Sequence, residues 1–295
     1  MSFLPSLLVL IQVAVAEPVP IAPKFRAGQV LLLDMKNTRE DNRAGRPTGT
    51  SKIPITLKIL KADANGFVVD WISGETRFED PAQASNPIFQ FASKTLKDLH
   101  MEAILNSRGA FQRLRNQADV EAKMQLAVDG AESIPEPRRP QTIDAMGRMI
   151  TPKALIAAVS KEVQLYFGLY GIEIEKGKPF EGSLEVPNPL GEGNLPSQIR
   201  IDLKEIDPRT EEVQLPLEQR YDPNALLSSL PAALGTAGPR LASAERLRSG
   251  SLFDTGQFTF DTRSGCMRRI QHERTATIRQ VRRIDRTEIT LLRSE

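Results

Sequence analysis

The triplet Asp254-Thr-Gly is the segment whose residue types most directly suggest a reaction. An aspartic protease uses two such carboxylates, which share one proton across a dyad. The chain has one copy of the triplet, and Asp261-Thr-Arg, where a partner triplet would be expected, lacks the glycine. Asp, Thr and Gly are also common turn formers, and the triplet directly precedes a predicted strand. We therefore interpret it as a turn, and a hydrolase is the least favoured function considered below.

Other catalytic and metal-binding patterns are also missing from the sequence. His100 and His272 are the only histidines and lie far apart in the chain, whereas zinc sites need clustered His, Cys or carboxylate ligands. Cys266 is the single cysteine, so no intramolecular disulfide is predicted, and we interpret it as a small buried residue. Neither a phosphate-binding loop nor a dinucleotide fingerprint is present. The sequence thus predicts a protein that is not an enzyme and has no cofactor.

Charge is balanced over the whole chain but uneven along it. The 39 basic and 37 acidic residues give a net charge of +2, which predicts no nucleic-acid partner. Nine arginines lie between Arg263 and Arg293, against three acids. One interpretation is a binding site for anionic sugars, lipid headgroups or an acidic partner. The other is the solvated face of a strand, which is the usual explanation for charges on a sheet surface. The candidate basic patch comprises Arg268, Arg269, Arg274, Arg279, Arg282 and Arg283.

The amino terminus has the pattern of an export signal. Residues 1–16 carry no charged side chain, and an apolar run ends in Ala14-Val-Ala16 before Glu17. Small residues in this spacing mark a cleavage site, so we predict a signal peptide over residues 1–16 and a periplasmic or extracellular protein. The run is shorter than the ~20 residues that span a bilayer, and no transmembrane segment is predicted for the mature chain. The alternative interpretation is a buried N-terminal strand.

Strict alternation of apolar residues predicts two similar hairpins. Ile55–Ile59 alternates, Asp63–Gly66 favours a tight turn, and Phe67–Trp71 resumes the alternation. The same pattern recurs at Ile199–Leu203 and Val213–Leu217. At a constant offset of 144, Ile55, Leu57, Ile59, Asp63, Val69 and Trp71 correspond to Ile199, Ile201, Leu203, Asp207, Val213 and Leu215. Gly28 and the hairpin around Gly109 have counterparts in Gly177 and in the hairpin around Gly265. Three features in the same order predict an internal repeat.

Helix signals and a proline-rich stretch complete the predicted organisation. Asn86-Pro87, Asn116 and Thr151-Pro152 each begin a predicted helix, and the last carries an apolar stripe to Phe167. We predict a signal peptide (1–16), an N-terminal β unit with helices (17–131), a Pro-rich connection (132–150) and a C-terminal β unit with a leading helix (151–295). The C-terminal strands are predicted at 257–261, 267–281 and 287–292, with the last turn at Asp285-Arg286.

These elements predict a fold of the α+β class, rich in β structure. We expect two similar antiparallel β-sheet units, half-barrel-like, each covered by helices.

Three short motifs resemble those of a family of exported bacterial cell-envelope proteins of unknown function. The motifs are Phe25-Arg-Ala-Gly, Glu175-Lys-Gly-Lys-Pro-Phe180 and Gly256-Gln-Phe-Thr-Phe-Asp-Thr-Arg-Ser-Gly265. The resemblance covers about residues 24 to 292, although Phe180 stands where tryptophan is more typical. It implies two similar antiparallel β halves and carries over no catalytic residue. The closing hairpin is also similar to those of periplasmic half-barrels that shelter lipids.

Two functions are compatible with these observations. In the first, curved sheets and the helices across them enclose an apolar or lipid-like ligand. In the second, the protein is an envelope interaction or assembly factor that acts through surface contacts. The identity of the partner is left open by the sequence.

Overall fold

The computed structural model describes residues 17–43, 48–132, 152–187, 194–226, 228, 250–278 and 280–295. The predicted signal peptide, residues 133–150 of the predicted connection and Arg279 lie outside the described residues. Of the predicted cleavage site, Ala14 and Ala16 are likewise outside, and Glu17 is exposed at the start of the described chain.

One large antiparallel sheet of 13 strands forms most of the described chain. A separate short pair joins β1 (Val19–Pro20) to β8 (Glu173–Ile174). The long strands of the large sheet are β2 (Val30–Asp41), β3 (Gly49–Asp63), β4 (Gly66–Ser73), β6 (Leu99–Leu105), β7 (Phe111–Leu114), β9 (Phe180–Pro187), β10 (Asn194–Ile201), β12 (Glu212–Tyr221), β13 (Gly250–Asp261), β14 (Cys266–Ile278) and β15 (Val281–Ser294). The short strands β5 (Arg77–Phe78) and β11 (Glu205–Asp207) pair with β3 and β12. The predicted β-rich class is confirmed.

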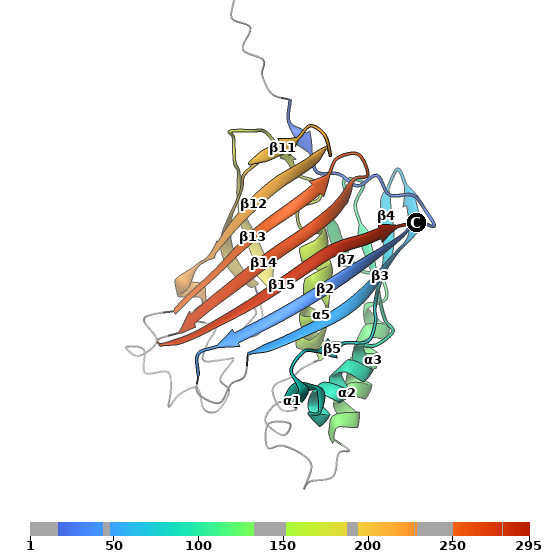
Figure 1. Ribbon diagram of the computed structural model, residues 1–295, viewed down its shortest axis with the longest axis vertical. Coiled ribbons are helices and arrows are strands. Elements are labelled where there is room, and N and C mark those ends of the chain that lie inside the picture. The colour runs from blue at the N-terminus through green and yellow to red at the C-terminus, as the bar shows by residue number, and fades with distance from the viewer. Residues whose placement is uncertain are drawn as a thin grey trace, which may run out of the picture.

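The order of the strands brings the two ends of the chain together at the centre of the sheet. The sheet runs β7-β6-β4-β3-β2-β15-β14-β13-β12-β10-β9, so strands from the two ends of the chain, β2 and β15, lie side by side at its centre (Figure 1). Both predicted halves therefore contribute to one open sheet. β7 and β9 are its two edges, and the chain between them passes through α3 (Gln117–Glu132) and α5 (Pro152–Phe167).

Helix α5 covers one face of the sheet, which we call the inner face. Figure 1 shows α5 behind the central strands. Its last turn and the turn that follows it pack on the sheet through aromatic rings, with centroid distances of 5.7 Å from Tyr166 to Trp71 and 5.9 Å from Tyr170, beyond the end of α5, to Phe260. The remaining helices, α1 (Pro81–Ala84), α2 (Pro87–Leu96) and α3, lie near the β7 side, where α3 contacts α5 and β6. None of the described helices has the length and hydropathy needed to traverse a bilayer.

The two predicted hairpins are both present in the sheet. Leu57 lies opposite Trp71 in the first, and Ile201 lies opposite Leu217 in the second. A strict offset of 144 would place Ile201 opposite residue 215, so the second register is displaced by two residues. An even displacement keeps the same side chains on the inner face. The alternating apolar residues of both hairpins are buried, except Phe67, which is partly buried. The internal repeat stays a prediction.

Two sequence-based turn assignments are wrong. β14 ends at Ile278 and β15 begins at Val281, so Asp285 and Arg286 lie inside a strand and not at the last turn. The Asp254-Thr-Gly triplet also lies within β13. In both places the charged residues suggested a surface turn. In the structure they lie inside strands, where oppositely charged side chains of neighbouring strands pair with them.

Candidate functional site

Side chains on the inner face form rows across the strands, because paired residues in a sheet point to the same side. Three successive rows cross β12, β13, β14, β15 and β2 and change in character along the strands. The apolar row comprises Leu215, Phe258, Ile270, Ile289 and Met35. The middle row comprises Leu217, Gly256, His272, Thr287 and Asn37. The charged row comprises Gln219, Asp254, Arg274, Asp285 and Arg39.

Asp254 is the most buried member of the charged row, with 1% of its surface exposed. The Arg274 guanidinium donates to both carboxylate oxygens, from Nε to Oδ1 at 2.8 Å and from Nη2 to Oδ2 at 2.7 Å. The Tyr221 hydroxyl donates to Oδ2 at 2.8 Å, and His272 Nε2 lies 3.2 Å from the same oxygen. We call these four residues the Asp254 cluster. A buried carboxylate is stable only with such partners.

The environment of the Asp254 cluster fixes its protonation states. Burial alone would raise the pKa of Asp254, but hydrogen bonds from Arg274 and then His272 outweigh it and hold the pKa well below its usual range. Burial opposes the charge on Arg274, yet Asp254 raises the pKa of that guanidinium further. Burial raises the pKa of the Tyr221 hydroxyl. At neutral pH the cluster therefore contains a paired carboxylate and guanidinium and a neutral tyrosine.

These protonation states are unsuited to acid–base catalysis. A general base works best with a pKa near the operating pH, and the pKa of Asp254 is shifted away from that range. The partners of Asp254 are an arginine, a tyrosine and a histidine, not the second carboxylate that a protease dyad needs. Burial also raises the pKa of the Cys266 thiol, which disfavours the nucleophilic thiolate. The arrangement is suited to holding charge in place.

The charged row becomes more exposed toward the centre of the sheet. Asp285 accepts a hydrogen bond from Arg39 Nε at 2.8 Å, and Arg283 Nε lies 2.7 Å from its other oxygen. Burial tends to raise the pKa of Asp285, but Arg39 and Arg283 lower it overall. The side chains of Arg39 and Arg283 are 57% and 40% exposed, against 28% for Arg274. Polar groups of this end are thus accessible from solvent.

The arginines of the predicted basic patch do not all lie together. Arg274 and Arg283 are on the inner face with the two aspartates. Arg268 and Arg269 lie near the start of β14, within 3.8 Å of Glu212 and Glu288 respectively. Arg282 lines a small depression of about 320 Å³ with residues from the end of β2. The patch as a functional site stays a prediction.

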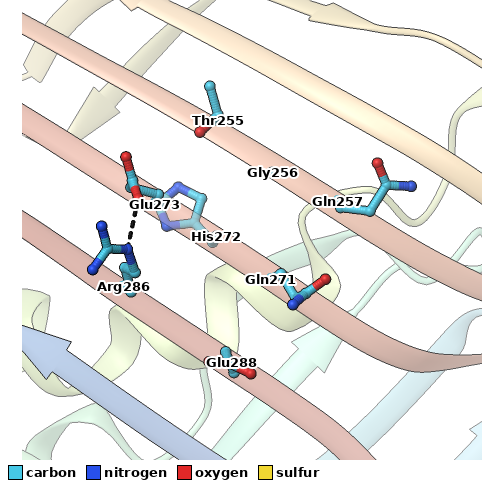
Figure 2. A pocket seen from close by; sticks show the side chains of 8 residues that line it. All are labelled: Thr255, Gly256, Gln257, Gln271, His272, Glu273, Arg286 and Glu288. Atoms are coloured by element: carbon cyan, nitrogen blue, oxygen red, sulfur yellow. Dashed lines mark hydrogen bonds and ion pairs between the residues drawn. The ribbon is translucent and has the colours of Figure 1, made fainter. Parts of the chain in front are cut away.

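The opposite, outer face of the sheet has a second depression, of about 360 Å³ (Figure 2). Its side chains belong to β13, β14 and β15, and Arg286 Nε donates to Glu273 Oε2 at 2.6 Å. Arg286 also pairs with Glu40 of β2. Residues lining the depression are Thr255, Gln257, Gln271, Glu273, Arg286 and Glu288, together with Gly256 and His272, which also belong to the middle row of the inner face. Apart from Gly256 these residues are all polar or charged, so the depression offers no apolar side chain, and we place the candidate site on the inner face.

The described residues contain no group of three His, Cys, Asp or Glu side chains placed to hold a metal ion. A polar or charged group could bind the exposed arginines Arg39 and Arg283. Thr287 and Asn37 of the middle row, whose side chains are hydrogen-bonded at 2.8 Å, lie beside them.

No protein-family model matches the sequence, and no curated protein does. Among solved structures, the chain is similar to lipovitellin in a structure of its lipid–protein interactions, at 8% identity and a TM-score of 0.48. That match covers 92% of this chain but only 26% of lipovitellin. A candidate lipoprotein from Parabacteroides distasonis ATCC 8503 matches at 8% identity and a TM-score of 0.32, over 94% of this chain and 99% of its own. A candidate outer-membrane lipoprotein-sorting protein domain from Vibrio parahaemolyticus matches at 12% identity and a TM-score of 0.24, over 92% of this chain and 86% of its own. Similarities at these values define no function.

Proposed function

We propose that the protein is a non-catalytic, exported protein of the cell envelope that binds an amphiphilic, lipid-like ligand on the inner face of its sheet. One observation carries the proposal. Along the central strands the inner face changes, within a few residues, from a buried apolar row to a row of partly exposed charges. A surface with this division matches a molecule that has an apolar tail and a polar head.

The two ends of the inner face would take different parts of the ligand. The tail would lie against the apolar row, where burial of hydrocarbon is favourable. Because the members of this row are already 0–4% exposed, the side chains that cover it would have to move aside to admit the tail. The head would meet the exposed guanidinium groups of Arg39 and Arg283 next to Thr287 and Asn37. The Asp254 cluster is internally paired, so its role is to hold the strands and the row in register beneath the head.

The test begins with protein purified from its own envelope and analysed by native mass spectrometry. The account predicts an additional mass that organic extraction identifies as a lipid or other amphiphile. The variant Arg39→Gln/Arg283→Gln should lose most of this mass, because the head loses its charged contacts. The matched control Arg200→Gln/Arg220→Gln removes two arginines from the outer face, where they pair with acids at 48% and 74% exposure, and should retain the ligand. A bare protein mass, or equal loss in both variants, would refute the proposal.

The alternative, an interaction protein that acts through its surface, is favoured by one separate feature: among the described residues, β9 pairs with another strand on one side only.

A further inference from the structure

Strand β9 ends the large sheet and has a described partner on one side alone, β10. The side chains of Glu181, Ser183 and Glu185 are exposed. Leu184 lies on the inner face, opposite Ser197 of β10, and is still 42% exposed. An edge of this kind presents unpaired backbone N–H and C=O groups to any approaching strand.

Pro196 in the neighbouring strand shows which backbone groups of β9 point outward. The Pro196 carbonyl accepts a hydrogen bond from the Asp222 amide at 2.9 Å, so the backbone of Pro196 faces the β12 side. Glu185 lies opposite Pro196, and in an antiparallel pair the backbone groups of such a residue point away from the neighbouring strand. The same holds for every second residue, hence for Glu181 and Ser183. The Leu184 carbonyl points the other way, since it accepts from the Ser197 hydroxyl at 3.1 Å.

The side chains of β9 alternate in character as well. Glu181, Ser183 and Glu185 are on the outer face, where Glu181 pairs with Arg200 at 2.8 Å. Gly182, Leu184 and Val186 are on the inner face, opposite Ile199, Ser197 and Leu195. A strand added to this edge would therefore meet carboxylates on one of its faces and apolar side chains on the other.

We propose that the free edge of β9 is a docking site for an extended segment of a partner protein, in which apolar side chains alternate with lysine or arginine. Backbone groups of Glu181, Ser183 and Glu185 would bind the added strand. The Glu185 carboxylate would select a basic side chain, whereas Glu181 is already paired with Arg200. A second copy of this chain fits less well. Antiparallel pairing of β9 with itself about Ser183 places Glu181 opposite Glu185 twice, and like charges in this position repel. This docking site is independent of the proposed amphiphile site.

The experiment uses the full chain and two short synthetic peptides, one of alternating valine and lysine and one of alternating valine and glutamate. Fluorescence anisotropy measures binding, and hydrogen exchange read by mass spectrometry measures protection of residues 180–187. The lysine peptide should bind and protect this segment, whereas the glutamate peptide should not. Glu185→Lys should reverse the preference between the two peptides.

Proline at position 183 provides the sharpest variant. Ser183→Pro removes an outward N–H without removing a backbone hydrogen bond to β10. It also removes the side-chain hydrogen bond from Gln198 Nε2 to the Ser183 hydroxyl at 2.9 Å, as Ser183→Ala does, so the two variants should melt alike. Ser183→Pro should bind the lysine peptide at least about tenfold more weakly than Ser183→Ala. Ser183→Ala keeps the N–H and is the matched control. If Ser183→Pro fails to fold, Glu185→Lys decides the matter alone. Equal binding of both peptides, binding without protection of residues 180–187, or a dimer whose protection maps to β9 would overturn the proposal.

Discussion

The two ends of the inner face belong to one sheet but are stabilised in different ways. At the apolar end Trp71, Tyr166 and Phe167 are almost fully buried, and their rings meet edge to face at centroid distances of 5.7 and 5.0 Å. At the charged end Asp254 is equally buried but depends on Arg274 for compensation. Stability at the first end thus follows buried apolar area, and at the second it follows charge balance. This difference predicts opposite responses to substitution and to pH.

The largest effect is expected at the apolar end. Trp71→Asp places an unpaired charge in the core and removes the largest buried side chain, so the free energy of unfolding should fall by more than about 5 kcal/mol. Thermal melts followed by circular dichroism would show an unfolded or insoluble protein. Leu292→Asp is the control, because Leu292 is 66% exposed on β15. A Trp71→Asp variant that melts like wild type would mean that the inner and outer faces are wrongly assigned.

Breaking the Asp254 pair should be the next largest effect. Asp254→Asn leaves the Arg274 charge buried without compensation, which costs about 3–5 kcal/mol of stability. The double variant Asp254→Leu/Arg274→Met removes both charges and should recover most of the loss in a denaturant titration. Glu218→Gln, which breaks an exposed outer-face pair with Arg220, should cost at most about 1 kcal/mol. Equal losses at the two sites would contradict the distinction between the buried row and the outer face.

A smaller effect is expected where the end of α5 and the turn after it are hydrogen-bonded to β14 and the residues before it. The Tyr170 hydroxyl donates to the Gly265 carbonyl at 3.2 Å and accepts from the Met267 amide at 3.0 Å. Tyr170→Phe leaves that buried amide unpaired and should cost about 1–3 kcal/mol. Tyr166→Phe removes one longer bond, to the Met267 carbonyl at 3.3 Å, and should cost less in the same unfolding measurement. The reverse ranking would show that α5 is held mainly by its rings.

The smallest effect concerns pH and the buried carboxyl of Glu162 on α5. Burial raises its pKa, a shift that Lys161 only partly offsets. The unfolded chain therefore releases this proton first, and stability falls as pH rises from the unfolded pKa of ~4.3 toward the folded value. Glu162→Gln should raise the melting temperature above that window and leave it nearly unchanged below.

Asp254 should behave in the opposite way. Its folded pKa is lowered, so its contribution is present above the unfolded pKa and is lost as pH falls toward the folded value. Melting temperatures of Glu162→Gln, Asp254→Asn and wild type across the acid range would separate the two. If the melting temperatures of all three proteins changed with pH in the same way, the buried environments assigned to Glu162 and Asp254 would be contradicted.

Local patterns predicted much of the sheet but little of the site. The alternation from Ile55 to Trp71 and the turn at Asp63–Gly66 lie close together in sequence, so they were sufficient to predict the first hairpin. The pairing of β2 with β15 joins residues such as Arg39 and Asp285, and no local signal indicates a contact over that separation. The Asp254 cluster depends on contacts between strands in the same way. Its one local signal is a carboxylate at an inward position of an alternating strand, between Leu252 and Phe258.

The chain's only tryptophan allows the central claim to be tested directly, because Trp71 lies at the apolar end of the inner face. The measurement is Trp71 fluorescence during titration with a fatty acid brominated in mid-chain, with the unbrominated fatty acid as control. The account predicts saturable quenching by the brominated compound alone, and weaker quenching in Arg39→Gln/Arg283→Gln. Binding of the brominated compound that leaves Trp71 fluorescence unchanged would place the ligand elsewhere and contradict the account.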